Sequence, residues 1–333
     1  MLPHPEGTQP CAITGLGVYR PRRVVENAEI APRHGVDAHW VEARAGIQAR
    51  HHAEPDETLV AMAAQASSAA LQVAGIGAGQ VDCVVLTTMS NVRQVPALAP
   101  ALAHTLGCTR AGAFDLNAAC AGFTYGLTLA RALIGARNAR HILVVATERM
   151  TDLIDPGDRA TALVFGDGAG AVVVSASQEV GIGPVSWGND GSGEKLFTLQ
   201  PDFTRLDADH PRPYVHMDGT RLAHIFPRIT RELAHRALAD NELSWKDLGA
   251  FIPHQANLRL NAMCLAGIDL PGHVAVATAI TRDGNTSSAS IPLAIHRLLA
   301  DHQARPGDLA LLVGYGVGLT WSAMVVRLPK AGT

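Results

Sequence analysis

The stretch DLNAACAGFTYGLTLA, residues 115–130, is the point from which the fold of this chain can be worked out. Small residues crowd Cys120, and an apolar helical pattern begins directly after it. This arrangement places the thiol at or near a helix N-terminus, where the helix dipole favours the thiolate, and the small neighbours leave room for a substrate. One interpretation is a nucleophilic cysteine. The other is a buried structural cysteine, the commonest fate of a free cysteine.

Short apolar runs alternate with longer helical patterns on both sides of this stretch. Strands that are apolar throughout are typical of a sheet covered on both faces, and the alternation favours a layered α/β architecture. We predict strands at residues 83–88, 142–146, 171–175, 249–252, 309–313 and 322–328, and helices at residues 62–73, 119–134, 222–239 and 290–300.

The chain also contains a faint internal repeat. One shift lays residues 121–131 on residues 289–299, and a similar shift lays ARHILVVATE, residues 139–148, on PGDLALLVGY, residues 306–315. Such self-similarity indicates two related halves, which we place on either side of residues 176–190.

Composition and charge argue against several classes of protein. Hydrophobic residues make up 47% and charged residues 17%, a balance opposite to that of disordered chains. The net charge is -3 without a basic stripe, so nucleic-acid binding is not predicted. The longest uncharged run, between Glu57 and Asp82, is polar and broken by glycines; we predict a buried helix and a loop there, and no membrane span. Five scattered cysteines and the lack of a visible secretory signal favour the cytoplasm and predict neither a disulfide framework nor a zinc site.

Three further segments carry candidate polar groups. His254 follows an apolar strand, where α/β sheets place reactive groups, although a structural histidine would look the same. Asn285 follows Gly284 and precedes a helix, a pattern that also fits an ordinary capped turn. The glycine-rich turn GYGVG, residues 314–318, can direct backbone N–H groups at a developing oxyanion or be a tight turn only.

Other familiar motifs are excluded. FGDGAGAVVV, residues 165–174, matches GxGxxA, but its β-branched end predicts a strand where a dinucleotide site requires a helix. HExxH, GxxxxGK[ST] and GxSxG are absent from the sequence, so zincins, P-loop proteins and serine hydrolases lack support.

Cysteine, histidine and asparagine in this chain order fit a nucleophile with two polar partners.

Six motifs in this order resemble the type III β-ketoacyl-acyl-carrier-protein synthases of the thiolase superfamily, over nearly the whole chain. Within this family the motifs resemble those of actinobacterial synthases, including those that prime polyketide assembly. The motifs are WVEARAGIQARH (residues 40–51), AACAGFTYGL (118–127), DRATALVFGDGAGA (158–171), IPHQANLRL (252–260), GNTSSASIPLA (284–294) and GYGVGLTW (314–321).

The resemblance implies a thiolase fold of the α/β class. Two pseudo-symmetric βα halves would pack as five layers, α-β-α-β-α, in agreement with the repeat. Residues 1–178 would form the half with the nucleophilic cysteine, and residues 179–333 the half with the histidine and the asparagine. The family also implies a homodimer.

The resemblance assigns Cys120 as nucleophile and His254 and Asn285 as its catalytic partners. It implies that Cys120 takes an acyl group from an acyl-CoA and that malonyl-carrier protein then loses CO₂ and attacks the acyl-cysteine. The N–H groups of His254 and Asn285 would stabilise the enolate, and the backbone N–H groups of Cys120 and Val317 the tetrahedral intermediate. Acyl-CoA and malonyl-carrier protein are substrates, and no cofactor or metal is expected.

The resemblance also implies binding residues. For CoA and pantetheine they are Trp40, Arg44, Arg159, Gly219 and Asn257, with the adenine between Trp40 and Arg159. Arg259 would meet the carrier protein, and His224 stands at a second position of that basic patch. The acyl pocket would include Leu163, Val164, Trp187 and, from the partner subunit, Val95.

Residue types separate the chain from other members of the superfamily. Thiolases have a second cysteine in the C-terminal glycine turn, and elongating synthases have a second histidine where this chain has Asn285. Two alternatives to a starter-condensing synthase stay open at this point. One is an acyltransferase that moves the acyl group from CoA or a carrier protein to another acceptor without decarboxylation, and the other is a partner subunit without catalytic activity.

Overall fold

Two five-stranded mixed sheets form the centre of the protein, whose computed structural model describes residues 2–93, 95–206 and 212–331. The first sheet has the order β1 (Cys11–Tyr19), β7 (Asp167–Ala176), β6 (His141–Arg149), β4 (Cys83–Thr87) and β5 (Gly112–Leu116). The second has the order β8 (Ile182–Asn189), β14 (Thr320–Arg327), β13 (Leu309–Gly316), β11 (Ala250–Pro253) and β12 (Ala275–Val276).

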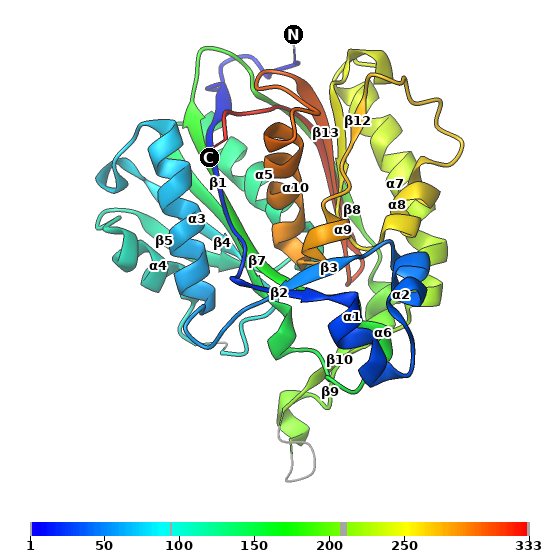
Figure 1. Cartoon of the computed structure of the whole chain (residues 1–333). Coiled ribbons are helices and arrows are strands. Elements are labelled where there is room, and N and C mark those ends of the chain that lie inside the picture. Colours follow the sequence, from blue (N-terminus) through cyan, green and yellow to red (C-terminus); the bar gives the residue numbers. More distant parts are fainter. Residues whose placement is uncertain (1, 94, 207–211, 332–333) are drawn as a thin grey trace.

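Helices cover both sheets and fill the space between them (Figure 1). Helices α3 (Leu59–Ala74) and α4 (Leu98–Leu106) cover the outer face of the first sheet, and α7 (Gly219–Asp240) with α8 (Leu258–Leu265) the outer face of the second. Helices α5 (Gly122–Gly135) and α10 (Ser290–Ala300) lie between the sheets. The result is the predicted α-β-α-β-α layering.

Burial of both faces explains why the strands are apolar throughout. Along β6, Ile142 and Val144 belong to the core between the sheets, while Leu143 and Val145 belong to the core beneath α3 and α4. A strand with a core on each side has no solvent face and shows no polar alternation. The reasoning that predicted a doubly covered sheet is therefore confirmed.

The two halves repeat the same connectivity. In each sheet the first three strands in the order given above are antiparallel neighbours, and the last three are parallel neighbours. Helix α5 precedes β6 just as α10 precedes β13, which is the pairing that the sequence repeat indicated. Strand β7 ends at Ala176 and β8 begins at Ile182; the division of the chain at residues 178 and 179 stays a prediction.

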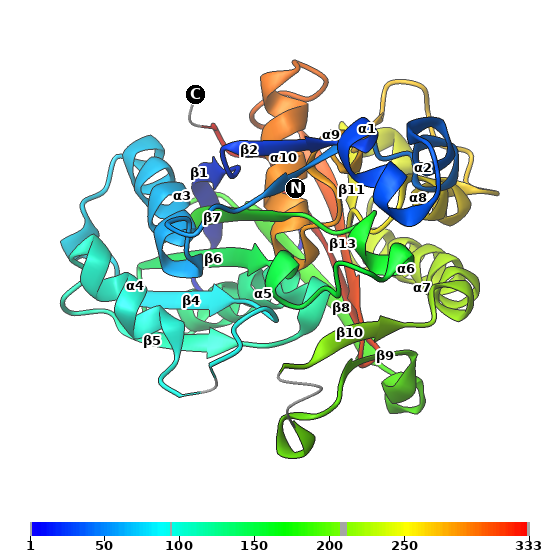
Figure 2. The same ribbon diagram turned by 60° about the horizontal axis from the view of Figure 1, so that its bottom comes forward.

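Small elements outside the two sheets lie near their ends (Figure 2). Near the N-terminus, β2 (Arg23–Glu26) pairs with β3 (Ala49–His52), and α1 (Asn27–Ile30) and α2 (Ala38–Ala45) lie between them in the chain. The short helix α6 (Arg159–Ala162), the hairpin of β9 (Phe197–Gln200) with β10 (Tyr214–Met217), and the short helix α9 (Ile280–Asp283) complete the fold.

Several expectations about single segments can now be settled. Gly168 and Gly170 of FGDGAGAVVV lie in β7 and Gly166 directly precedes it, so this segment enters a strand, as predicted, and the dinucleotide interpretation is excluded there. The predicted helix at residues 119–134 is a short 3-10 turn, η3 (Ala119–Ala121), followed by α5. Helix α3 forms within the long uncharged run, and in the described residues no helix is long and apolar enough to cross a bilayer.

Candidate active site

Cys120 lies in the turn η3 that connects β5 to the N-terminus of α5. The thiol is buried, with 7% of the residue exposed, at the interface between the two halves. Ala119 directly before it has φ 46°, a left-handed backbone that is uncommon for a residue with a β-carbon. The sharp turn sets the sulfur at the start of the helix, as the sequence predicted.

Some of the surroundings of the Cys120 sulfur raise the pKa of the thiol, and others lower it. Burial raises the pKa of the Cys120 thiol to about 12, and the charge of Glu148 acts in the same direction. A hydrogen bond from the Ser287 hydroxyl, whose oxygen lies 3.4 Å from Sγ, lowers the pKa of this thiol. The N-terminus of α5 also favours the thiolate.

His254 lies directly after β11, and its backbone N–H continues the ladder by donating to Val313 O. Its Nδ1 lies 2.7 Å from the Ser290 hydroxyl, which in turn accepts a hydrogen bond from Gln255 N. Burial lowers the pKa of His254 to about 3, so the ring is neutral near pH 7. A Ser290 hydroxyl that donates to Nδ1 leaves the ring proton on Nε2.

Asn285 follows a turn that only glycine adopts easily, because Gly284 has φ 68° and a β-carbon there would lie 2.8 Å from Arg50 Cβ. The Oδ1 atom of Asn285 accepts a hydrogen bond from Ser287 N at 2.9 Å. Since the amide oxygen is held in this way, the NH₂ group is the end left to donate to a ligand. Among the described residues, this NH₂ group donates one long hydrogen bond, 3.5 Å to Ala256 O.

The glycine-rich segment 314–318, whose first three residues end β13, approaches Cys120 from the other half. A β-carbon on Gly316 would lie 2.8 Å from Cys120 N and 3.1 Å from Ala121 N, so a side chain at this position would displace the backbone. Val317 follows Gly316 and lines the same pocket as Cys120. This close approach brings the two backbone N–H groups predicted to form an oxyanion hole into one region.

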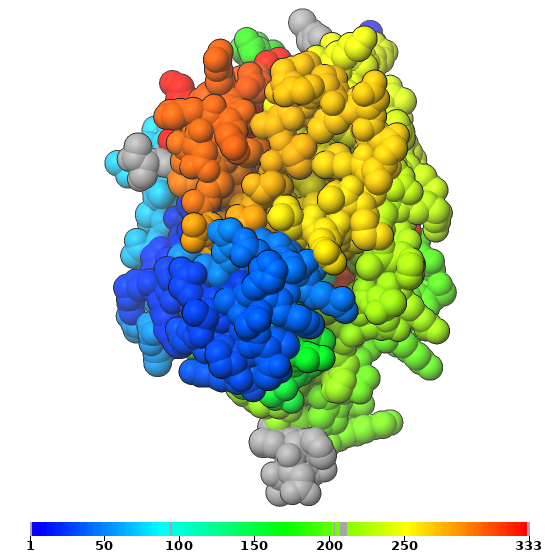
Figure 3. Space-filling view, turned by 45° about the vertical axis from the view of Figure 1, so that its right-hand side comes forward, coloured from blue at the N-terminus to red at the C-terminus, as the bar shows by residue number. Residues whose placement is uncertain are grey.

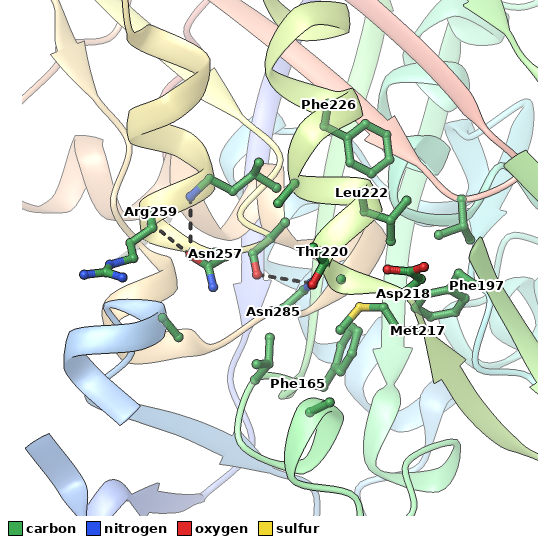
Figure 4. Close-up of a pocket in the computed structure, with 18 of the residues that line it drawn as sticks. Phe165, Phe197, Met217, Asp218, Thr220, Leu222, Phe226, Asn257, Arg259 and Asn285 are labelled. Atoms are coloured by element: carbon green, nitrogen blue, oxygen red, sulfur yellow. Dashed lines mark hydrogen bonds between the residues drawn. The ribbon is translucent and has the colours of Figure 1, made fainter. Parts of the chain in front are cut away.

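A pocket of about 1100 Å³ collects the predicted residues. Figure 3 shows the blue N-terminal segment that carries α2 against the yellow and yellow-green surface of α8 and α7, the elements that surround its entrance. In Figure 4, Asn257 and Arg259 lie on one side of Asn285 and apolar side chains gather on the other. The predicted residues that line the pocket are Trp40, Arg44, Cys120, Arg159, Leu163, Val164, Gly219, His254, Asn257, Arg259, Asn285 and Val317.

The entrance carries stacked cationic and aromatic groups. The guanidinium carbon of Arg159 lies 5.2 Å from the centroid of the Trp40 ring, and that of Arg44 lies 5.6 Å from it. An adenine between Trp40 and Arg159 therefore requires these side chains to separate, and this arrangement stays a prediction. Asn257 caps α8 with its Oδ1, which leaves its NH₂ group to donate, and Gly219 begins α7.

Two of the four residues predicted for the acyl pocket line the pocket of this chain. Leu163 and Val164 line the pocket. The prediction for Trp187 was wrong: this residue lies on the edge strand β8, with its ring centroid 5.7 Å from that of Tyr125 and the rings tilted by 38°, and it does not line the pocket. Val95 is 82% exposed and outside the pocket of its own chain, so its role in a partner subunit stays a prediction.

Sequence reasoning missed several residues of the site. An apolar wall comes from separate elements, namely Phe165, Phe197, Met217, Leu222 and Phe226. Tyr315 packs edge-on against the His254 ring at 5.2 Å, and Ser287 and Ser290 contact the predicted catalytic groups. The serines were visible in GNTSSAS, but nothing in the pattern says which hydroxyl points where. No group of three or more His, Cys, Asp or Glu side chains suited to a metal ion occurs in the described ranges.

Two family profiles and several known proteins match this chain. Residues 114–191 match the profile of 3-oxoacyl-[acyl-carrier-protein (ACP)] synthase III, and residues 238–328 that of its C-terminal part. β-Ketoacyl-[acyl-carrier-protein] synthase III 1 of Streptomyces coelicolor is 44% identical, over 97% of this chain and 98% of that protein. The β-ketoacyl-[acyl-carrier-protein] synthase III of Streptomyces glaucescens is 43% identical, with the same coverage of 97% and 98%. The crystal structure of the priming β-ketosynthase of the R1128 polyketide pathway superposes with a TM-score of 0.94 at 42% identity, over 99% of both chains.

Proposed function

Because the chain belongs to the β-ketoacyl-acyl-carrier-protein synthase III family, we propose that Cys120 carries the acyl group in a two-step condensation. The enzyme has the thiolase fold and is an acyltransferase that condenses an acyl-CoA starter with malonyl-carrier protein, with loss of CO₂, to initiate fatty-acid or polyketide synthesis. One observation supports the assignment of roles: a thiol, an imidazole and an amide from the two halves line the same pocket.

In the first step, Sγ of Cys120 attacks the thioester carbon of the acyl-CoA. The new C–S bond forms, the bond to the CoA sulfur breaks, and the thiol proton leaves on CoA. The carbonyl oxygen becomes an oxyanion on the way, and the N–H groups of Cys120 and Val317 are placed to donate to it. Gly316 permits this because it has no β-carbon, which would otherwise lie 2.8 Å from Cys120 N.

In the second step, the malonyl thioester loses CO₂ and its electron pair moves into an enolate. His254 donates from Nε2 and Asn285 from its NH₂ group to the enolate oxygen. A neutral imidazole suits this task, and the pKa of His254 near 3 keeps it neutral over the working range. The enolate carbon then attacks the acyl-cysteine, the C–C bond forms, and Cys120 is expelled. No step uses a metal or a cofactor.

Substrate binding is assigned from the same pocket. We propose that Trp40, Arg44 and Arg159 hold the nucleotide of CoA, whose phosphates suit guanidinium groups. Asn257 and Gly219 would contact pantetheine. Arg259 and His224 lie at the mouth, where the carrier protein would dock. The apolar wall behind Asn285 would receive the acyl chain of the starter.

We further propose that the enzyme works as a homodimer. β5 is the edge strand of the first sheet and leaves backbone groups unpaired on one side. Exposed apolar side chains accompany that edge: Phe114 on β5 itself, and Val92 and Val95 on the segment after β4. Pairing through β5 would cover these residues. All five cysteines are unpaired, which fits the cytoplasm as the place of action.

Intact-protein mass spectrometry tests the proposed function. The enzyme is incubated with a panel of acyl-CoAs and then with malonyl-carrier protein. We expect an acyl adduct that Cys120→Ala abolishes and that Cys108→Ala, the loss of another buried thiol, leaves in place. Asn285→Ala should keep the adduct and slow its condensation by about 10²–10³-fold.

Three results would contradict the proposal. An adduct that forms and never condenses would favour transfer to another acceptor without decarboxylation. No adduct from any acyl-CoA would exclude acylation from CoA and point to a carrier-bound donor or a non-catalytic subunit. Normal condensation by Asn285→Ala would remove that residue from the decarboxylation step.

A further inference from the structure

Ser287 contacts two of the three residues to which the chemistry is assigned. Its hydroxyl donates to Sγ of Cys120 across 3.4 Å, and its backbone N–H donates to Oδ1 of Asn285 across 2.9 Å. The residue is completely buried at the start of the 3-10 turn η8 (Ser287–Ala289). None of the steps described above uses this hydroxyl.

The backbone at Ser287 is strained in a way that aims the side chain. Its φ is 49°, a left-handed value that is unfavourable for a residue with a β-carbon and that persists only where the surroundings enforce it. The repeat shift that lays Ala121 on Ala289 also lays Ala119 on Ser287, and Ala119 has a φ of 46°. Each half therefore builds the same left-handed turn, and the two turns pack against each other. One turn carries the nucleophile, and the other presents a hydroxyl to it.

Glu148 holds the serine turn in place from the opposite half. The Ser288 hydroxyl donates to Oε1 of Glu148 and the Ser90 hydroxyl donates to Oε2, each at 2.6 Å. Glu148 is fully buried on β6 and does not line the pocket. Its hydrogen bonds from the hydroxyl and the backbone N–H of Ser288 anchor the residue directly after Ser287.

The sulfur needs such a donor, because most of its surroundings disfavour negative charge. Burial is the main influence that raises the pKa of Cys120, and Glu148 adds to it. Burial also raises the pKa of the nearby Tyr315 phenol well above 10, so this group stays neutral. Within the part of the chain that the structure describes, Ser287 supplies the side-chain hydrogen bond that the sulfur receives. A hydrogen bond to a charged group is worth more when water is excluded.

We propose that Ser287 is a catalytic residue whose hydroxyl donates a hydrogen bond to the Cys120 thiolate, both when the sulfur attacks acyl-CoA and when it is expelled after condensation. The inference rests on the proposed role of Cys120 as nucleophile. No proton moves to or from Ser287, since the thiol proton still leaves with CoA. The backbone N–H of the same residue keeps the Asn285 amide in its donating orientation, and this contact does not depend on the side chain.

The rate of Cys120 alkylation by iodoacetamide tests this role without any substrate. The rate is followed by mass spectrometry of the Cys120 peptide between pH 6 and pH 10 for the wild type, Ser287→Ala and Ser287→Gly. Glycine adopts this left-handed backbone without strain, so Ser287→Gly removes the hydroxyl without the conformational cost that alanine carries at φ 49°. Thr286→Val is the matched control, because the Thr286 hydroxyl is equally buried and has no hydrogen-bond partner among the described residues.

We expect alkylation of both Ser287 variants to be slower by about ten-fold or more at each pH, which corresponds to a loss of thiolate. Thr286→Val should stay within about two-fold of the wild type. Acylation by acyl-CoA should show a lower kcat with KM retained, since the hydroxyl contacts the sulfur rather than CoA. Alkylation of Ser287→Gly at the wild-type rate, or an equal loss in Thr286→Val, would overturn the proposal. A wild-type enzyme that takes no acyl group would refute the proposed function, while the alkylation rates would still decide the role of Ser287.

Discussion

The ion-pair cluster around Asp283 offers a sharp test of how Asn285 is held. Asp283 is the last residue of α9, and Gly284 and Asn285 follow it directly. Arg20 donates to both carboxylate oxygens at 2.9 Å, and Arg297 of α10 donates to one of them at 3.1 Å. Segments from both halves of the molecule thus clamp the turn that carries the catalytic amide.

Asp283→Asn would leave two guanidinium groups facing a neutral amide. The Asp283 side chain is 3% exposed, whereas Arg20 is 18% and Arg297 34% exposed, so water screens part of the uncompensated charge. Removing one partner of a buried ion pair costs roughly 3–5 kcal/mol, and the partial exposure places this case at about 3 kcal/mol of unfolding free energy. Because the turn leads into Asn285, condensation should also fall by about ten-fold, while acylation of Cys120 stays within about three-fold.

Urea denaturation measures the stability, and mass spectrometry measures acylation and condensation separately. Asp56→Asn is the matched control: its carboxylate also binds an arginine, Arg22, through two oxygens, but the two side chains are 58% and 69% exposed. Such an exposed pair contributes under about 1 kcal/mol. Equal losses of stability in the two variants would refute the argument from burial. A parallel fall of acylation and condensation in Asp283→Asn would refute the link to Asn285.

Three further predictions concern the site. Gly316→Ala should slow acylation by about 10²-fold, because the new β-carbon would lie 2.8 Å from Cys120 N. The control Gly272→Ala, which has open space around it, should not slow acylation, and wild-type acylation kinetics in Gly316→Ala would contradict the oxyanion-hole assignment. Condensation by pre-acylated enzyme should not lose rate through His254 between pH 7 and pH 5, because its pKa near 3 means that the ring gains a proton only in stronger acid; single-turnover rates that fall with a midpoint near pH 6.5 would disagree. Trp40→Ala should raise the KM for acyl-CoA by about three- to ten-fold and leave that for an acyl-pantetheine thioester unchanged, and an equal rise for both thioesters would argue against nucleotide stacking on this ring.

The strands that sequence reasoning found are those with a core on both faces. Cys83–Thr87 and Leu309–Gly316 are buried along nearly their whole length, so their apolar composition alone predicts them. The edge strand β5 is largely exposed or half-buried, and β1 contains Gly15 and Gly17, where α3 packs against the backbone. Strands of this kind lack the apolar run on which the prediction depended, and both were missed.

The residues of the site divide in a similar way. Cys120, His254 and Asn285 lie in local sequence patterns that are typical of a helix start, a strand end and a glycine turn. These patterns were enough to predict the three residues as candidates for catalysis. Their proximity was carried by the family resemblance, because no local pattern states which turns of two separate halves will meet. Trp187 shows that its position in the sequence was not enough to assign it to the pocket, because it lies on the edge strand β8 and does not line the pocket.

The sequence by itself determined the layered α/β class, the two related halves and the three candidate catalytic residues, because burial and turn chemistry leave periodic and local traces in the chain. Only the tertiary structure decided that the Ser287 hydroxyl donates to the Cys120 sulfur, that Ser290 orients His254, and that Asp283 clamps the turn before Asn285. The physical reason is that a hydrogen bond depends on distances of about 3 Å and on direction, and these are set only when the two halves pack.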